Sequence, residues 1–257
     1  MGRRPVHRRH RRAAGRAARA GPPAADALGE EGHRQVNIFG YAQQFFDAPG
    51  RWSGADGIPT RLLEHVQYSG LALLIAMVIA LPVGLITGHT GRGGNALAVL
   101  ATAARALPSF GLLVLLTILM GLGLTPVMVP LVALAVPPIL VTTYEAMRSV
   151  DPSLVDAARG IGLPWWRILA QVELPVALPL ILSGIRSGAI QIVSTATIAA
   201  YVSFGGLGRY IVDGLSQVDY AKVVGGAVLV ASLALATLAL FWGLGKLLVS
   251  PGVRRGR

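Results

Sequence analysis

The segment 106-ALPSFGLLVLLTILMGLGLTPVMVPLVALAVPPILVTTY-144 carries no charged side chain. A helix needs about 20 apolar residues to cross a bilayer, so this run is long enough for two crossings. It also contains its own break at residues 121–126, GLGLTP, because glycine and proline end one helix and begin another. Two further uncharged runs occupy residues 187–208 and 223–245. The sequence therefore predicts an all-α integral membrane protein.

Composition excludes several other classes of protein. Hydrophobic residues make up 53% of the chain and charged residues 14%, with a mean hydropathy of +0.60, which does not fit a soluble globular enzyme. There is no cysteine, so thiolate catalysis, disulfides and zinc–thiolate sites are excluded. The histidines lack the spacing of a metal site; they are His7, His10, His33, His65 and His89.

The net charge of +11 does not indicate nucleic-acid binding. Eight arginines fall within residues 1–19, and the remainder of the chain has 15 basic and 12 acidic side chains. Residues 1–35 have no apolar period and are expected to be disordered. Three interpretations stay open for them: a solvated or lipid-attracted tail, an artefact of an upstream start codon, or a targeting sequence. Residues 36–65 are expected to form an interfacial segment that precedes the first span. Residues 66–248 are expected to form the transmembrane domain, and residues 249–257 a basic cytoplasmic tail.

Five spans are expected, at residues 66–88, 95–121, 126–146, 177–203 and 223–248. Lysine and arginine are typically enriched in cytoplasmic loops. If the C-terminus is cytoplasmic, nine such residues lie inside, namely Arg92, Arg105, Arg148, Arg159, Arg167, Lys246, Arg254, Arg255 and Arg257. The outer loop 204–222 then holds two, Arg209 and Lys222. The count predicts a cytoplasmic C-terminus and, with five spans, an N-terminus outside.

The loop at about 147–176 has the pattern of two short helices. Asp151-Pro152 supplies an N-cap and a first-turn proline, and Leu154, Ala158 and Ile161 share one face. Gly160 and Gly162 permit a stop. Pro164 then begins a second amphipathic helix, with apolar residues at Trp165, Ile168, Leu169 and Val172, which is expected to end at Leu174-Pro175.

The residues of this loop and their spacing resemble the cytoplasmic "EAA" signature of binding-protein-dependent ABC importer permeases. Asp156-Ala157-Ala158, three residues, Gly162, nine residues and Val172-Glu173-Leu174-Pro175 reproduce the spacing of E-A-A-x3-G-x9-I-x-L-P. Asp156 replaces the usual glutamate and Val172 the usual isoleucine, and both changes keep charge or shape.

The resemblance implies a type I importer fold, with five core transmembrane helices and a cytoplasmic coupling helix. In that family the helix docks into a separate ATP-hydrolysing subunit. By resemblance, the coupling contacts are Asp156, Ala157, Ala158 and Gly162, with Leu154 and Ile161 on the apolar face. The other implied partners are an extracytoplasmic substrate-binding protein, a second permease subunit and membrane lipid. This chain would bind no cofactor, and ATP and magnesium would belong to the partner.

Other stretches resemble the permeases that import glycine betaine, carnitine, choline or proline betaine. They are Glu64-His65 with Tyr68-Ser69, Ala106-Leu107-Pro108-Ser109-Phe110, Ser194-Thr195-Ala196-Thr197-Ile198 and Gly205-Gly206-Leu207-Gly208. Permeases for methionine and other amino acids share part of the last stretch, so an amino-acid substrate stays an alternative. An ion-driven secondary transporter is a second one, although the middles of the spans carry no Asp or Glu. A structural membrane protein or assembly factor is a third, although neither would need an ordered loop with this spacing.

No phosphate-binding loop, G-x-S-x-G elbow or H-E-x-x-H helix occurs, so ATP hydrolysis requires another chain. Arg186 is the charge within a predicted span, and it is interpreted either as a gate or pathway residue or as a cation that snorkels towards the cytoplasmic side. Gly184 and Gly188 predict a close helix contact. The rings of Phe110, Tyr201, Phe204 and Tyr210 could face a cationic solute, but core packing or an interfacial aromatic belt is the favoured explanation, so they are not assigned to a substrate site.

Overall fold

A computed structural model describes residues 37–106, 108–202 and 204–249. Within these ranges the regular structure is helical, with no strand. The α-helices are α1 (Ile38–Asp47), α2 (Ile58–Thr90), α3 (Gly94–Ala106), α4 (Ser109–Met120), α5 (Leu124–Arg148), α6 (Pro152–Gly160), α7 (Trp165–Arg167), α8 (Leu174–Thr195), α9 (Gly208–Gln217) and α10 (Tyr220–Leu248). The expected tail at 1–35, and that at 249–257 apart from Val249, lie outside the described residues.

Four helices are long and apolar enough to cross a membrane. They are α2, α5, the continuous winding Trp165–Val202, and α10. The span expected at 95–121 is bent, because α3 and α4 meet at 77°. Pro108 stands at the start of α4 with extended backbone (φ −71°, ψ 105°), and a proline ring disfavours the helical conformation of the residue before it. The bundle has a fifth crossing only if the bent pair forms one span.

The predicted stop at Leu174-Pro175 is also wrong. The chain winds without a break through α7, a π-helical segment at Ile168–Glu173, α8 and a 3-10 segment at Ala196–Val202. The amide of Leu174 donates to the carbonyl oxygen of Leu169, five residues back. This wider turn accommodates Pro175, which has no N–H to donate and whose ring would otherwise collide with the preceding turn.

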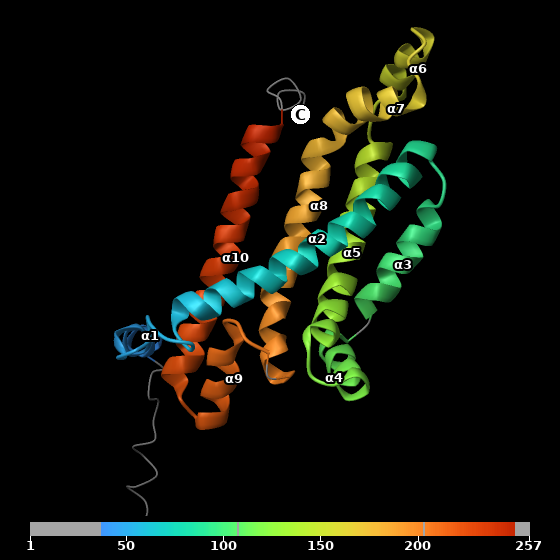
Figure 1. Cartoon of the computed structure of the whole chain (residues 1–257). Helices are drawn as coiled ribbons and strands as arrows, with labels where there is room; N and C mark the ends of the chain where they lie inside the picture. Colours follow the sequence, from blue (N-terminus) through green and yellow to red (C-terminus); the bar gives the residue numbers. More distant parts are fainter. Residues whose placement is uncertain (1–36, 107, 203, 250–257) are drawn as a thin grey trace, which may run out of the picture. The chain divides into compact units, whose positions relative to one another are not determined.

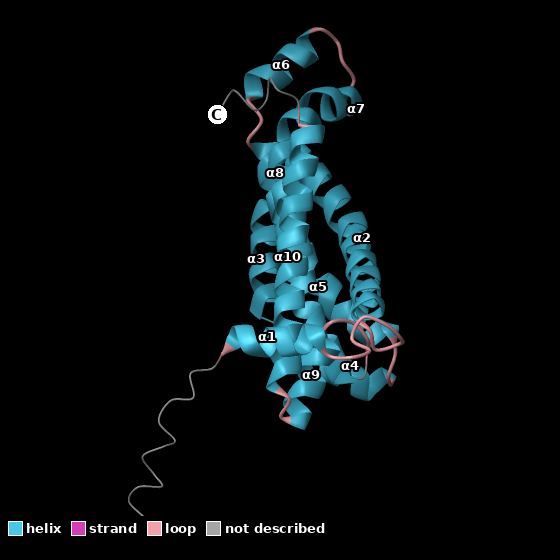
Figure 2. Ribbon diagram, turned by 90° about the vertical axis from the view of Figure 1, so that its left-hand side faces the viewer, coloured by secondary structure: helices cyan, strands magenta, loops and turns pink. Residues whose placement is uncertain are grey.

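Helix α5 lies between α2 and α8, and glycines allow the helices to approach closely (Figures 1 and 2). A Cβ placed on Gly84 would lie 2.8 Å from the Cβ of Thr143, and one on Gly88 would lie 2.5 Å from the Cβ of Met147. Both distances are too short for real side chains. The α2–α5 contact therefore requires glycine at each position.

The contact predicted at Gly184 and Gly188 is confirmed, and its partner is again α5. A Cβ on Gly184 would lie 2.7 Å from the Cβ of Thr142, and one on Gly188 would lie 3.1 Å from the side chain of Ile139. A small-xxx-small face of this kind lets two backbones pack closely in a membrane, where dispersion contacts replace the hydrophobic effect as the driving force.

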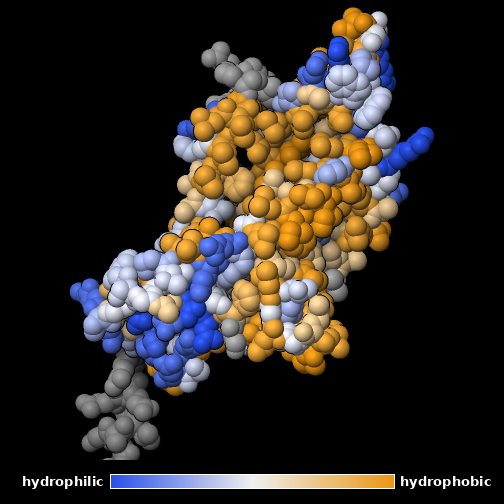
Figure 3. Space-filling view, viewed as in Figure 1, coloured by the Kyte–Doolittle hydropathy of each residue, from blue (hydrophilic) through white to orange (hydrophobic). Residues whose placement is uncertain are grey.

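The path of the chain places α6 and the last turn of α10 at the same end of the bundle (Figure 1). Helix α8 runs from that end to the opposite one, and α10 returns. Figure 3 shows apolar side chains across the middle of this face, with hydrophilic ones gathered near α6 and near α1. The stretch 204–222, expected to be a loop, contains the amphipathic helix α9, in which Arg209 and Asp213 form an i,i+4 ion pair of 3.1 Å.

The structure also corrects the charge count. Arg105 lies at the far end of α3 from the turn that joins α2 to α3, so it does not belong with the charges near α6. The opposite end carries Arg51 and Arg61 in addition to Arg209 and Lys222. With Arg105 assigned to neither end, the count of nine against two becomes eight against four, and three of the eight, at 254, 255 and 257, lie outside the described residues.

Candidate functional site

The predicted coupling segment forms a projecting elbow, residues 151–163, whose helix α6 begins where the sequence predicts. Asp151 is the N-cap, and its Oδ1 accepts a hydrogen bond of 2.9 Å from the amide of Ser153. Pro152 fills the first helical position, where no amide donor is needed. The backbone and side-chain hydrogen bonds from Ser153 hold the pKa of Asp151 below its usual value, because they favour the ionised carboxylate.

The way in which α6 ends explains why residue 162 is a glycine. Gly162 has φ +81°, its amide donates to the oxygen of Arg159 at 2.9 Å, and the amide of Leu163 donates to the oxygen of Ala158 at 3.2 Å. These two bonds form a Schellman motif, which requires a left-handed residue at the position of Gly162. A Cβ here would meet nothing within 4 Å. Within this chain Gly162 is therefore needed for its backbone conformation, not for close packing.

The faces of the elbow differ in exposure. Ile161 is 78% exposed and Leu154 is 47% exposed, whereas Ala158 on the same face is only 6% exposed. Ala158 therefore supports α6 from beneath. Asp156 and Ala157 face outward, and Asp156 pairs with Arg159 at 3.4 Å. The outward surface is an apolar patch flanked by one exposed ion pair, which is suited to docking another protein.

The base of the elbow contains a buried contact that sequence reasoning missed. Oε2 of Glu173, in the π-helical segment, lies 2.6 Å from Nδ1 of His89 in the last turn of α2. Glu173 is 4% exposed, and the ring of Trp165 lies 6.3 Å from the imidazole, centroid to centroid. The signal available in the sequence was an acid between apolar Val172 and Leu174, which requires a buried partner. The contact links α2 to the elbow.

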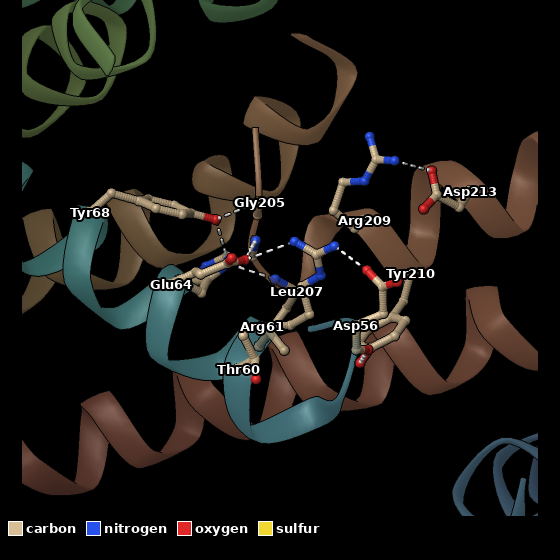
Figure 4. A network of polar contacts seen from close by, with 12 residues as sticks. Asp56, Thr60, Arg61, Glu64, Tyr68, Gly205, Leu207, Arg209, Tyr210 and Asp213 are labelled. Atoms are coloured by element: carbon tan, nitrogen blue, oxygen red, sulfur yellow. Dashed lines mark hydrogen bonds and ion pairs between the residues drawn. The ribbon is translucent and has the colours of Figure 1, made fainter. Parts of the chain in front are cut away.

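A second polar cluster lies at the end of the bundle away from the elbow (Figure 4). We call it the polar clasp; it comprises the side chains of Asp56, Arg61, Glu64, His65 and Tyr68 and the backbone of residues 205–207. Oε2 of Glu64 accepts hydrogen bonds from the amide of Gly206 at 2.8 Å and from Arg61 at 2.9 Å. Arg61 also pairs with Asp56. The carboxylate thus fixes a backbone turn 142 positions away.

His65 forms the buried centre of the polar clasp. Its Nδ1 accepts a hydrogen bond of 3.3 Å from the amide of Leu207, so Nε2 carries the proton and donates to the oxygen of Val193 at 3.0 Å. The hydroxyl of Tyr68 donates to the oxygen of Gly205 at 3.1 Å. His65 is fully buried, and these bonds hold it as a neutral structural histidine.

The glycines of the polar clasp are required by space as well as by conformation. Gly206 has φ +89°, and a Cβ on it would overlap the hydroxyl of Tyr68, while one on Gly205 would overlap the carboxylate of Glu64. The sequence singled out both halves of this cluster as separate stretches. Their contact arises only because α2 begins beside the turn that precedes α9.

The remaining candidates are scattered. Arg186 lies on α8 in a groove facing α10. Phe110 and Tyr201 form an exposed edge-to-face pair at 5.3 Å, Phe204 packs on Tyr68, and Tyr210 packs on Phe45. The hydroxyl of Tyr210 donates to the oxygen of Asp56 at 2.6 Å, and burial raises its pKa. The four aromatic residues therefore do not converge on one site.

Comparison with known proteins shows which family has this sequence pattern and architecture. Residues 80–255 match the family described as binding-protein-dependent transport system inner membrane component. The glycine betaine/carnitine/choline transport system permease protein OpuCB of Bacillus subtilis is 34% identical over 172 residues, which cover 67% of this chain and 79% of that protein. The osmoprotectant import permease protein OsmW of Salmonella typhimurium is 34% identical over 197 residues, 74% of this chain and 91% of that protein.

A solved structure shares the fold. An inward-facing MetNI methionine ABC transporter chain aligns with a TM-score of 0.65 at 22% identity, covering 75% of this chain and 96% of that chain. The helical bundle and the matched family model together identify the family. The chain belongs to the family of binding-protein-dependent transport system inner membrane components and is a multi-pass, non-catalytic permease subunit.

Proposed function

We propose that this chain carries an osmoprotectant such as glycine betaine, carnitine, choline or proline betaine across the cell membrane. The supporting observation is the 34% identity to a glycine betaine/carnitine/choline permease and to an osmoprotectant permease, over two thirds or more of the chain. A permease named for glycine betaine and proline betaine is 31% identical over 79% of the chain. Transport proceeds by alternating access, in which a two-state bundle opens to one side and then to the other. An amino-acid substrate such as methionine has weaker support, because the methionine transporter shares the fold at only 22% identity.

The elbow transmits the motion of a separate ATPase subunit. Its exposed Leu154, Asp156, Ala157 and Ile161 form the contact surface. Ala158 and Gly162 position this contact surface. The buried Ala158 holds α6 in place, and Gly162 ends the helix. ATP and Mg²⁺ bind to that partner and not to this chain. The full importer includes a second permease subunit and an extracytoplasmic binding protein that delivers the solute.

The elbow end of the bundle faces the cytoplasm. Arginine and lysine favour the cytoplasmic side, and the corrected count is eight against four. Three of the four cations at the opposite end are matched by acids: Arg61 with Glu64 at 2.9 Å, Arg209 with Asp213 at 3.1 Å and Lys222 with Asp219 at 3.9 Å. This placement makes the polar clasp extracytoplasmic.

Single-cysteine labelling tests the orientation without background, because the chain contains no cysteine. Ile161→Cys should react with a membrane-impermeant maleimide only after the cells are opened. Val218→Cys is the matched control: it is also exposed, at 66%, but lies at the opposite end, and should react in intact cells. Reversal of the two reactivities contradicts the proposed orientation.

Uptake by cells tests the identity of the solute and the requirement for the ATPase subunit separately. Cells that express the full importer and lack other betaine carriers should take up labelled glycine betaine, carnitine or choline, and unlabelled methionine should not compete. Mutation of the phosphate-binding lysine of the ATPase subunit should abolish uptake. Uptake that persists in the ATPase mutant favours an ion-driven carrier, and uptake of methionine alone favours the amino-acid alternative.

A further inference from the structure

One face of the span that contains α8 is polar along much of its length. Four hydroxyl or amide side chains recur there at intervals of three or four residues, which places them on one side of the helix. They are Ser187, Gln191 and Ser194 in α8 and Thr197 in the 3-10 segment that continues it. The central parts of α2 and α5, residues 70–86 and 126–141, carry no polar side chain. We call the four residues the polar face.

The polar face points away from the core of the bundle. Ser187 and Ser194 are exposed, and the other two residues are partly exposed. The buried side chains of the same stretch lie on the opposite side of the helix; they are Ile185, Ala189, Ile192 and Ala196. This pattern is ordinary for a helix in water. Within a membrane, polar side chains on an outer face are costly unless water or another protein covers them.

The contact between α8 and α5 shows the depth of the polar face. A Cβ on Gly188, the neighbour of Ser187, would lie 3.1 Å from the side chain of Ile139 and 3.4 Å from the oxygen of Ala135. Both of these residues are near the middle of α5, which runs from Leu124 to Arg148. The polar face extends for about 15 Å at 1.5 Å per residue, about half the thickness of a hydrocarbon core. It therefore begins near mid-membrane and not at headgroup level.

Two members of the polar face have side chains without a hydrogen-bond partner in the part of the chain that the structure describes. The hydroxyl of Ser187 donates to the oxygen of Ser183 at 2.9 Å, and that of Thr197 donates to the oxygen of Ser194 at 2.7 Å. The side chains of Gln191 and Ser194 make no such bond. A glutamine amide offers two N–H donors and one oxygen acceptor, and lipid tails can pair with none of them. Gln191 therefore requires a polar neighbour such as water or a solute.

The chemistry of the polar face favours a water-filled path over a contact with another helix. Where helices of this chain pack closely, glycines make the contact, at Gly84 and Gly88 on α2 and at Gly184 and Gly188 on α8. The polar face has hydroxyl and amide groups in their place, which water can wet. These groups are uncharged, so they neither repel nor trap one sign of charge. Such a surface suits a zwitterion that carries a quaternary ammonium and a carboxylate.

We propose that the polar face of α8 lines the aqueous path of the solute, and that the side-chain amide of Gln191 donates a hydrogen bond to the carboxylate of the solute. This inference rests on the osmoprotectant function proposed above. A hydrogen bond to a charged acceptor is stronger than one between neutral groups. A neutral donor nevertheless holds a carboxylate less tightly than the paired N–H groups of an arginine would, so the solute is recognised and still released.

Thiol labelling of the complete importer in its membrane tests whether water reaches the polar face. Gln191→Cys and Ser194→Cys are compared with the matched control Val78→Cys, at a position that is 73% exposed in the apolar middle of α2. The probe is a methanethiosulfonate that carries a trimethylammonium group. The two α8 variants should react at least about tenfold faster than the control, because a thiol reacts as its thiolate, which forms where water surrounds it. Equal rates at positions 191 and 78, or no reaction at 191, overturn the proposal.

Protection by solute during transport tests the role of Gln191 separately. Glycine betaine should slow the labelling of Ser194→Cys. Adding Gln191→Leu should raise the concentration needed for this protection about tenfold, the effect of losing one hydrogen bond to a charged group, and Gln191→Asn should restore part of it. Unchanged protection in the leucine variant, or no protection by glycine betaine or methionine, overturns the proposal. Protection by methionine alone keeps the path along α8 and instead contradicts the osmoprotectant function.

Discussion

Glu173 and His89 stand 84 positions apart and meet at 2.6 Å beneath the elbow. One residue lies in the wide turn that follows the elbow, and the other in the last turn of α2. The contact therefore joins the segment after the elbow to α2, and the glycine contacts of α2 join that helix to α5.

Breaking this contact should cost more than breaking the exposed ion pair of the elbow. Glu173→Ala leaves His89 without its partner in a buried setting, so the unfolding free energy should fall by about 2–3 kcal/mol. Asp156→Ala removes an exposed pair and should cost less than about 1 kcal/mol. Unfolding of the two variants in detergent micelles measures the difference. Equal losses contradict a specific role for the Glu173–His89 contact.

Two substitutions of Gly162 distinguish a requirement for its left-handed backbone conformation from a requirement for close packing. Gly162→Ala forces a Cβ into the left-handed region and should destabilise the end of α6 by about 1 kcal/mol. Gly162→Asn is larger but tolerates that region. If the backbone conformation is what coupling needs, solute uptake should be higher for the Asn variant than for the Ala variant. The reverse order indicates close packing against the ATPase subunit.

The glycines of the polar clasp should not accept a methyl group. Gly206→Ala adds a Cβ that overlaps the hydroxyl of Tyr68 at a left-handed position, so the turn before α9 should separate from α2. Gly54→Ala is the matched control, because it also has positive φ (+83°) but open space around it. Protease sensitivity of this end should rise for Gly206→Ala only. Similar sensitivity in both variants attributes the effect to φ alone.

Tyr68→Phe tests one hydrogen bond of the same cluster. It removes the donor to the oxygen of Gly205 while keeping the ring that packs on Phe204. The expected loss is about 1 kcal/mol of unfolding free energy. Thermal unfolding in detergent is the measurement, and an unchanged midpoint shows that the hydroxyl contributes nothing.

The raised pKa of Tyr210 predicts that the stability of the protein changes at alkaline pH. Burial raises the pKa of its phenol, so the folded state keeps the proton at a pH where the unfolded chain has lost it. The stability from the neutral phenol is fully present below the unfolded pKa of about 10 and is lost as the pH rises through the folded pKa. The difference between the wild-type protein and Tyr210→Phe should therefore decrease above pH ~10. Phenolate absorbance follows the titration, and a pH-independent difference contradicts the prediction.

Four of the five spans, the start of α6 and the family spacing of the elbow could be read from the sequence because they depend on local composition. Apolar runs of sufficient length form helices in lipid wherever they occur, and Asp151-Pro152 caps a helix through its own next residues. The bend between α3 and α4, by contrast, was missed because Pro108 was read as part of one span. The continuous winding past Pro175 was missed because a π turn is not visible in a helical period.

The sequence alone determined that this chain is a helical membrane permease, because length, hydropathy and motif spacing are properties of neighbouring residues. The tertiary structure alone decided which polar groups share their burial cost. Glu173 needed His89, and Glu64 needed the amide of Gly206. A buried charge is stabilised by whatever lies within a few ångströms, and that neighbour is set by helix packing, not by distance along the chain.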